Sequence, residues 1–171
     1  MFTDLLTVST FNCKNVKTSL AEVQQLCDKS DIVFLQETWL TSQELHIVTS
    51  IDSDFHARAY SAMDVSSDVL RGRPHRGVAI LWRKELGGCK IIETADKRLM
   101  CLEFTSNNNS ILFINVYLPC DTSDYLDDYA FCLAIATSNI DSHPCNHAGL
   151  IGDLNANVIQ GGHSLYGKEV T

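Results

Sequence analysis

Short runs of β-branched and other apolar residues recur along this chain and alternate with amphipathic helical patterns and turn signals. The two clearest runs are GVAILWR at 77–83 and DIVFLQE at 31–37. Both are long enough for a buried strand and far too short to cross a bilayer as a helix. Strands that alternate with helices are typical of the α/β class, and 171 residues suffice for one domain with its own core. We therefore expect a single α/β domain over residues 1–171, with no membrane association.

The same pattern predicts eight strands and three helices joined by hairpins and loops. Ser19 is expected to cap the first helix, because Glu22 three residues later completes a capping-box pattern. The asparagine-rich stretch at 106–109 is a hairpin turn signal, and residues 52–76 are mostly typical of a loop. The strands are expected at 5–12, 31–37, near 55–61, 77–83, 89–93, 99–105, 110–117 and 147–154, and the helices at 19–29, 41–51 and 124–139.

Acidic residues outnumber basic ones by 21 to 13, which gives the chain a net charge of −8. A chain of this kind does not resemble a general nucleic-acid coat, whose affinity comes from neutralising phosphates. The excess of carboxylates instead suits a protein that gathers acidic side chains around a divalent cation.

The seven cysteines indicate an intracellular protein, nuclear or cytoplasmic and not secreted. Their number is odd, no pair has CxxC spacing, and several lie within apolar runs, which is typical of buried free thiols in a reducing compartment. The first residues also lack the basic segment of a secretory signal. A zinc site formed by His143, Cys145 and His147 is an alternative, but their alternate positions do not match the paired spacing usual for zinc ligands.

Several of the expected strands end in acid, amide or phenol side chains, and functional residues in α/β sheets gather at the carboxyl ends of strands. Residues two apart on a strand share a face, so the polar pairs that end 110–117 and 147–154 can each project together. Such a cluster offers hard oxygen ligands suited to Mg²⁺ or Mn²⁺. Its expected chemistry is metal-assisted attack of water on a phosphodiester, with a carboxylate orienting or deprotonating the water. The residues are Asn12, Gln36, Glu37, Asn115, Tyr117, Asp153 and Asn155.

Each of these residues also has a purely structural interpretation. Asn12 can be a turn residue after its strand, and Asp153 with Asn155 can form another such turn. Glu37 can begin the helix expected next, and Tyr117 can be a half-buried aromatic of the sheet. None of the residues is specific alone, but their order and positions together favour a functional site.

Four segments resemble, in order, motifs of the endonuclease/exonuclease/phosphatase superfamily: STFN at 9–12, FLQETW at 34–39, NVYLP at 115–119 and GDLN at 152–155. This superfamily includes deoxyribonuclease I, exonuclease III-type apurinic/apyrimidinic endonucleases, sphingomyelinases and inositol polyphosphate 5-phosphatases. The segment GRPHRGVAILWR at 72–83 is similar to one in the endonuclease domains of non-LTR retrotransposons.

The resemblance implies a four-layer α/β sandwich of two packed β-sheets flanked by helices, with a metal site where the sheets meet. It implies that Asn12 and Glu37 are the metal-binding and metal-orienting residues, with Glu37 the main ligand of Mg²⁺ or Mn²⁺. It further implies that Tyr117 contacts the scissile phosphate, that Asp153 activates or orients the attacking water, and that Asn155 supports Asp153 and the phosphate. DNA is the substrate that the retrotransposon-like segment implies.

The sequence departs from the superfamily pattern in two places. The pattern closes with a Ser-Asp-His motif beyond GDLN, which residues 156–171 do not contain, so the fold is expected to be incomplete at its C-terminus. Asp141, Ser142 and His143 have the same residue types in another order, and we do not assign them that role. In addition, Arg76 stands where the retrotransposon domains often have glycine.

The leading hypothesis is Mg²⁺-dependent phosphodiester hydrolysis by a DNA endonuclease of retroelement origin, with activity impaired in this chain. One alternative is a catalytically inactive fragment or a binding module. Another keeps the fold but changes the substrate to a lipid or inositol phosphate, which the acidic charge favours mildly and the 72–83 segment disfavours. No protein partner is indicated by the sequence.

Overall fold

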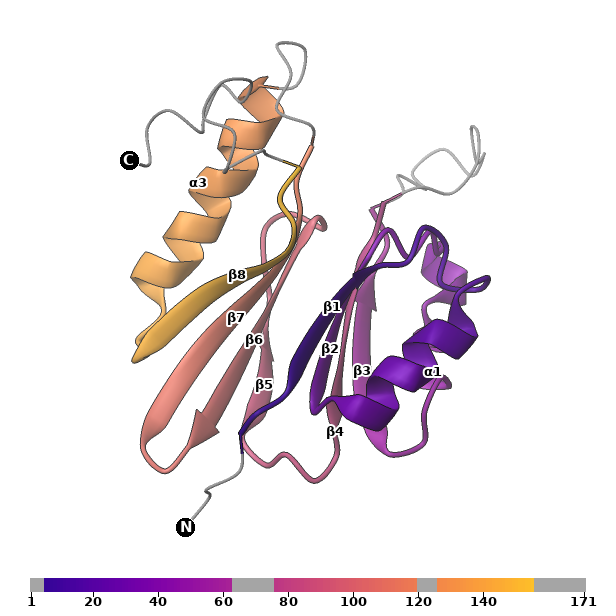
Figure 1. Cartoon of the computed structure of the whole chain (residues 1–171). Helices are drawn as coiled ribbons and strands as arrows, with labels where there is room; N and C mark the ends of the chain where they lie inside the picture. The colour runs from indigo at the N-terminus through magenta and orange to yellow at the C-terminus, as the bar shows by residue number, and fades with distance from the viewer. Residues whose placement is uncertain (1–4, 63–75, 120–125, 156–171) are drawn as a thin grey trace.

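The computed structural model describes residues 5–62, 76–119 and 126–155, which form two four-stranded β-sheets packed face to face (Figure 1). Helices cover the outer face of each sheet, so the layers follow the order helix, sheet, sheet, helix. This is the α/β sandwich that we expected from the sequence. The elements are β1 Val8–Asn12, α1 Leu20–Lys29, β2 Ile32–Gln36, a 3₁₀ helix Ser42–Glu44, α2 His46–Thr49, β3 Phe55–Tyr60, β4 Val78–Arg83, β5 Cys89–Ile92, β6 Leu99–Ser106, β7 Asn109–Tyr117, α3 Leu126–Ser142 and β8 His147–Asp153.

The first sheet has the strand order β1-β2-β4-β3, with β1 parallel to β2 and the other two pairs antiparallel. All five residues of β2 are buried, because α1 covers one face of the sheet and the second sheet covers the other. This double burial explains why residues 32–35 are apolar in succession instead of alternating, with a polar residue, Gln36, only at the end of the strand. Val23 and Cys27 of α1 belong to one buried cluster with Val33 and Leu35 of β2.

The second sheet has the strand order β5-β6-β7-β8, antiparallel except for the parallel pair of β7 and β8. Helix α3 covers its outer face through Tyr129, Cys132 and Ala136, which share a buried cluster with Cys101 and Ile114 of the strands. In each sheet, the strand that precedes a helix pairs in parallel with the strand that follows it. These pairs are β1 with β2 on either side of α1, and β7 with β8 on either side of α3.

A third apolar cluster fills the space between the sheets and fixes how they stack. Phe34 of β2 and Phe113 of β7 lie with their ring centroids 5.7 Å apart across this interface. Ile80 on the first sheet and Met100 and Leu102 on the second are fully buried in the same layer. Burial of each such side chain contributes roughly 1.5–3 kcal/mol, so this layer stabilises the packing of the two sheets against each other.

The expected strand bounds agree with the structure to within one residue, except at the start of β1. Strand β1 begins at Val8, and Leu5 is 89% exposed, so the prediction of a strand from residue 5 is wrong. Helix α3 continues to Ser142, three residues beyond the expected end, and residues 124–125 of that prediction lie outside the described chain. Asn107 and Asn108 have φ of +51° and +64°, which is the left-handed backbone that a two-residue hairpin turn requires.

The capping box lies at a different helix from the one predicted. Ser19 precedes α1 but makes no side-chain cap there, because its hydroxyl donates to the carbonyl of Cys13 at 2.9 Å. The segment expected as one helix at 41–51 is instead a 3₁₀ turn followed by the short α2. The capping box stands at this turn, where the Glu44 carboxylate accepts from the backbone and hydroxyl of Thr41.

The six cysteines within the described segments are all free, as predicted, and Cys120 lies outside those segments. Cys13, Cys27, Cys101 and Cys132 are buried. Burial raises the pKa of the Cys13 and Cys101 thiols to about 12, so these groups stay protonated and inert at neutral pH. None of the helices in the described segments is long and apolar enough to span a bilayer.

Candidate active site at the junction of the two sheets

The carboxyl ends of the two parallel strand pairs meet at one end of the sandwich. In the first sheet Asn12 of β1 stands opposite Gln36 of β2, and Glu37 follows. In the second sheet Tyr117 of β7 stands opposite Asp153 of β8. Because β1 and β8 also contact each other, the sequence-predicted residues on these strands come together.

The side-chain amide of Asn12 joins the two sheets at this point. Its nitrogen donates one hydrogen bond of 2.8 Å to Oε1 of Glu37 and another of 2.9 Å to Oδ2 of Asp153. Its oxygen accepts from the backbone N–H of Lys14 at 3.3 Å, which fixes the orientation of the amide. Two carboxylates from different sheets therefore share one neutral donor, and each has lone pairs left for a further partner.

Glu37 follows β2 with a left-handed backbone, φ +54°, which is uncommon for a non-glycine residue. Its backbone carbonyl accepts from the N–H of Asn15 at 2.8 Å, so the loop after β1 holds it in place. The indole N–H of Trp39 donates to Oε2 of Glu37 at 3.1 Å, and Trp39 is itself left-handed. Unfavourable backbone of this kind persists where the surroundings fix it, and it is concentrated at functional sites.

The phenol of Tyr117 faces the same carboxylates. Burial, the negative charge of Glu37 and a hydrogen bond to it, together with the charge of Asp153, raise the pKa of Tyr117 to about 12. The positive charge of Arg76 opposes this shift. Tyr117 is therefore a neutral hydrogen-bond donor throughout the physiological pH range.

Asp153 and Asn155 form a compact turn at the end of β8. The backbone N–H of Asn155 donates to Oδ1 of Asp153 at 3.1 Å, so both oxygens of that carboxylate are held. The side-chain amide of Asn155 donates to the carbonyl of Leu118 at 2.6 Å. Asn155 thus supports Asp153 through its backbone, while its role toward a phosphate stays a prediction.

Gly152, which precedes Asp153, must be glycine for two reasons. Its φ of +133° is a conformation that other residues rarely adopt. A Cβ atom built there would lie 2.2 Å from the carbonyl oxygen of Val116 on the neighbouring strand. The first residue of the GDLN segment therefore lets β8 approach β7 closely enough to bring Asp153 to the site.

Gln36 and Asn115 were expected at the open cluster, but the structure places them beneath it. Both are buried, and Nε2 of Gln36 donates to Oδ1 of Asn115 at 2.8 Å. Nδ2 of Asn115 in turn donates to the carbonyls of Leu35 at 3.1 Å and Ala79 at 2.9 Å. This bridge between the sheets uses the whole amide of Asn115, so Asn115 is a structural residue and not an exposed partner of Tyr117.

Two further residues, which the sequence did not indicate as site residues, belong to the site. Trp39 lies within the FLQETW segment, yet nothing in its spacing shows that the indole reaches Glu37. Arg76, noted as a departure from glycine, has φ +63°, which glycine adopts at no cost. The next residue, Gly77, has φ +91°, and a Cβ there would lie 2.6 Å from Oγ1 of Thr38.

The chemistry of the donor set fits a hard divalent cation. Glu37 and Asp153 provide carboxylates that both face Nδ2 of Asn12, while the Asn12 oxygen accepts from the backbone of Lys14. Mg²⁺ is commonly held by one or two carboxylates and completes its shell with water and substrate phosphate, so a pair of acids is sufficient. Within the described segments no group of three or more His, Cys, Asp or Glu side chains is arranged to hold a metal. The zinc alternative would use His143, but Nε2 of His143 lies 3.2 Å from Oε1 of Glu103 instead.

Comparison with known proteins identifies the family of this chain. The model of the endonuclease/exonuclease/phosphatase family matches residues 9–165, and the chain belongs to that family. A search of the curated proteins finds no match.

Solved structures share the fold. A 3′ phosphatase from Neisseria bound to a product DNA hairpin has a TM-score of 0.62 and 17% identity, over 89% of this chain and 58% of that one. An AP endonuclease from Archaeoglobus fulgidus has a TM-score of 0.60 and 19% identity, over 89% of this chain and 58% of that one. The D. rerio protein TDP2, complexed with a single-strand DNA product, has a TM-score of 0.57 and 20% identity, over 89% of this chain and 61% of that one. The chain thus spans about three-fifths of the length of these structures.

Proposed function

We propose that this chain carries part of the active site of a Mg²⁺-dependent phosphodiesterase that cleaves DNA, as an endonuclease of retroelement origin. One observation carries the proposal: a carboxylate from each sheet accepts a hydrogen bond from the same amide of Asn12. Two acids that converge on a neutral donor are mutually repulsive, and a cation between or beside them relieves that repulsion.

Glu37 would be the principal ligand of the metal, with Asp153 beside it and Asn12, which donates to both carboxylates, orienting them. When bound, Mg²⁺ or Mn²⁺ would stabilise negative charge on the phosphate and on the leaving oxygen. The hydrogen bonds from Asn12 and Trp39 hold both oxygens of Glu37 in one orientation, so little freedom would be lost on metal binding.

The residues of this chain supply the remaining functions. The carboxylate of Asp153, held by Asn12 and by the backbone of Asn155, accepts a proton from the attacking water. The neutral phenol of Tyr117 donates a hydrogen bond to an oxygen of the scissile phosphate. The high pKa of Tyr117 is consistent with that donor role, since a phenolate would repel the phosphate.

DNA is supported as the substrate by two kinds of observation. The 3′ phosphatase and TDP2 structures that share this fold were determined with DNA products. The 72–83 segment is similar to retrotransposon endonuclease domains and supports the retroelement origin. A nuclear or cytoplasmic location accords with free buried thiols. A lipid or inositol phosphate is the second candidate, favoured by the net charge of −8.

Because the chain spans about three-fifths of its structural relatives, cleavage is best tested in an extended protein. The C-terminal segment of the A. fulgidus endonuclease, fused after Thr171, would extend the chain to about the length of that relative. We expect this protein to nick plasmid DNA with Mg²⁺ and not with a chelator, whereas the 171-residue chain alone cleaves slowly or not at all.

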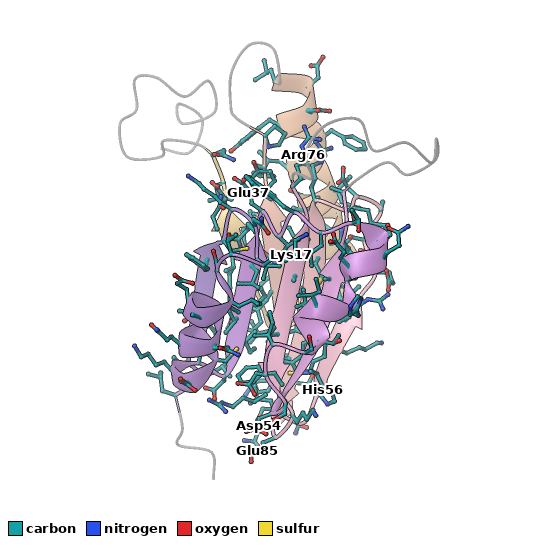
Figure 2. All side chains as sticks on the ribbon, turned by 90° about the vertical axis from the view of Figure 1, so that its right-hand side faces the viewer. Lys17, Glu37, Asp54, His56, Arg76 and Glu85 are labelled. Atoms are coloured by element: carbon teal, nitrogen blue, oxygen red, sulfur yellow. The ribbon has the colours of Figure 1, made fainter. Side chains whose placement is uncertain are left out.

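Asp153→Asn in the fused protein should lower kcat by about 10²–10⁴-fold, as is typical for loss of a general base. The matched control is Asp54→Asn, at the opposite end of the molecule from Glu37 (Figure 2). Rates are normalised to folded protein by circular dichroism. Near-full activity of folded Asp153→Asn would contradict the proposed role.

A further inference from the structure

A shallow groove of about 420 Å³ lies beside the candidate active site and is lined partly by basic side chains. Its cations are Arg76, Lys97 and Arg98, and its acids are Asp96 and Asp128. A cationic groove is unexpected on a chain whose net charge is −8.

The backbones of two groove residues are bonded directly to the site. The carbonyl of Arg76 accepts from the N–H of Trp39 at 2.9 Å, and the Trp39 indole donates to Glu37. The carbonyl of Arg98 accepts from the N–H of Tyr117 at 3.1 Å. Figure 2 shows Arg76 and Glu37 at the same end of the molecule. A strand whose phosphate reached Tyr117 and Glu37 would therefore continue over this groove.

The three cations of the groove are not equivalent. Arg98 donates to both oxygens of Asp96, at 3.1 and 2.7 Å, and its Nη1 lies 3.5 Å from Asp128. Its side chain is only 11% exposed, so its charge is already compensated within the wall of the groove. Arg98 and Asp96 therefore shape the groove and do not offer a free charge.

Arg76 and Lys97, in contrast, form no ion pair within 4 Å with any residue that the structure describes, although Arg76 interacts electrostatically with Asp96 and Lys97 with Glu93. The ammonium of Lys97 lies 4.3 Å from the ring centroid of Tyr60, which positions it without neutralising it. The Tyr60 hydroxyl donates to Glu93 at 2.6 Å, so the ring is fixed. Lys97 thus lines the groove with its ammonium placed over the ring of Tyr60.

We propose that Arg76 and Lys97 bind a non-scissile phosphate of the DNA strand, next to the one that is cleaved. The inference rests on the proposed function. The second subsite would favour a polynucleotide, since a substrate with a single phosphodiester leaves it empty. Arg and Lys contacts to phosphate supply most of the sequence-independent affinity for DNA and make it depend on salt.

The test measures binding of a fluorescent single-stranded DNA 12-mer to the 171-residue chain by anisotropy, from low to moderate salt. Arg76→Gln and Lys97→Gln should each weaken binding roughly tenfold at low salt, about the effect of one charge-assisted hydrogen bond. Each should also reduce the slope of log K against log salt by about 0.7, the value for one phosphate on a single strand. Lys97→Arg should retain the affinity, since it retains the charge.

Lys84→Gln is the matched control, because Lys84 lies near Asp54 at the opposite end and should leave affinity and slope unchanged. Equal losses in Lys84→Gln and Lys97→Gln would overturn the inference, as would Arg76-dependent binding to anionic phospholipid vesicles without binding to DNA.

Mn²⁺ binding, measured on the same proteins, separates the two proposals. If Mn²⁺ binding requires Glu37 while DNA binding is unchanged in Arg76→Gln and Lys97→Gln, the proposed phosphate subsite is overturned and the proposed metal site is supported. If DNA binding requires both Arg76 and Lys97 but no Mn²⁺ is bound, the proposed metal-dependent function is overturned and the phosphate subsite is supported.

Discussion

Asn12 donates a 2.9 Å hydrogen bond to Asp153, a residue 141 positions further along the chain. The same nitrogen donates to Glu37, so one short side chain sets the separation of two carboxylates that belong to different sheets. Loss of this amide would affect both the packing of the sheets and the geometry of the site.

Asn12→Ala should lower the free energy of unfolding by roughly 1–3 kcal/mol, because two part-buried carboxylates lose their shared donor. Added Mg²⁺ should recover part of this loss, since a ligand that binds only the folded state stabilises it. Urea denaturation with and without Mg²⁺ measures both effects. Gln25→Ala, at an exposed position of α1, is the control and should change stability by less than about 0.5 kcal/mol. An equally small effect of Asn12→Ala would show that the bridge contributes nothing.

Asn115→Ala should be the more destabilising change, by roughly 2–4 kcal/mol, because the amide of Asn115 makes three buried hydrogen bonds. Its loss leaves Gln36 and two backbone carbonyls short of a partner between the sheets. Thermal and urea melts provide the measurement. If Asn115→Ala unfolds no more easily than Gln25→Ala, the interpretation of Asn115 as the bridge between the sheets is wrong.

The contrast between Asn12 and Asn115 shows how far the sequence could predict this molecule. Both are amides near strand ends, and their spacing could place both at the site. Residues two apart do share a face, but the sequence does not show which strands of the opposite sheet cover that face. Asn115 lies where Leu35 and Ala79 offer carbonyls, and this depends on how the sheets stack.

Most of the strands were predictable, because runs such as β4 are short, apolar and bounded by turn residues. Helix caps were harder to predict. A Ser-x-x-Glu pattern begins at Ser19, yet the Ser19 hydroxyl donates to the carbonyl of Cys13 instead of capping the helix. The left-handed backbone of Glu37 and Arg76 was not predictable either, since neither residue type prefers it and tertiary hydrogen bonds impose it.

The phenol of Tyr117 should ionise near pH 12, above its ordinary value of 10. Because the folded state favours the neutral phenol, Tyr117 contributes a constant stability below pH 10 that is lost as the pH rises from 10 through 12. Subtracting the ultraviolet titration of Tyr117→Phe from that of the wild type isolates this phenol. Glu37→Gln should shift its ionisation to lower pH, since the charge of Glu37 helps to raise the pKa. An unchanged titration in Glu37→Gln would place Tyr117 away from that carboxylate.

The most direct test of the proposed metal site is Mn²⁺ binding to the 171-residue chain, measured by electron paramagnetic resonance of the free ion. The wild type should bind one Mn²⁺ weakly, and Glu37→Gln should lose most of that affinity while its circular dichroism stays folded. Glu22→Gln, at an exposed position of α1, should bind as the wild type does. Equal Mn²⁺ affinity in the wild type and Glu37→Gln would contradict the assignment of Glu37 as the metal ligand.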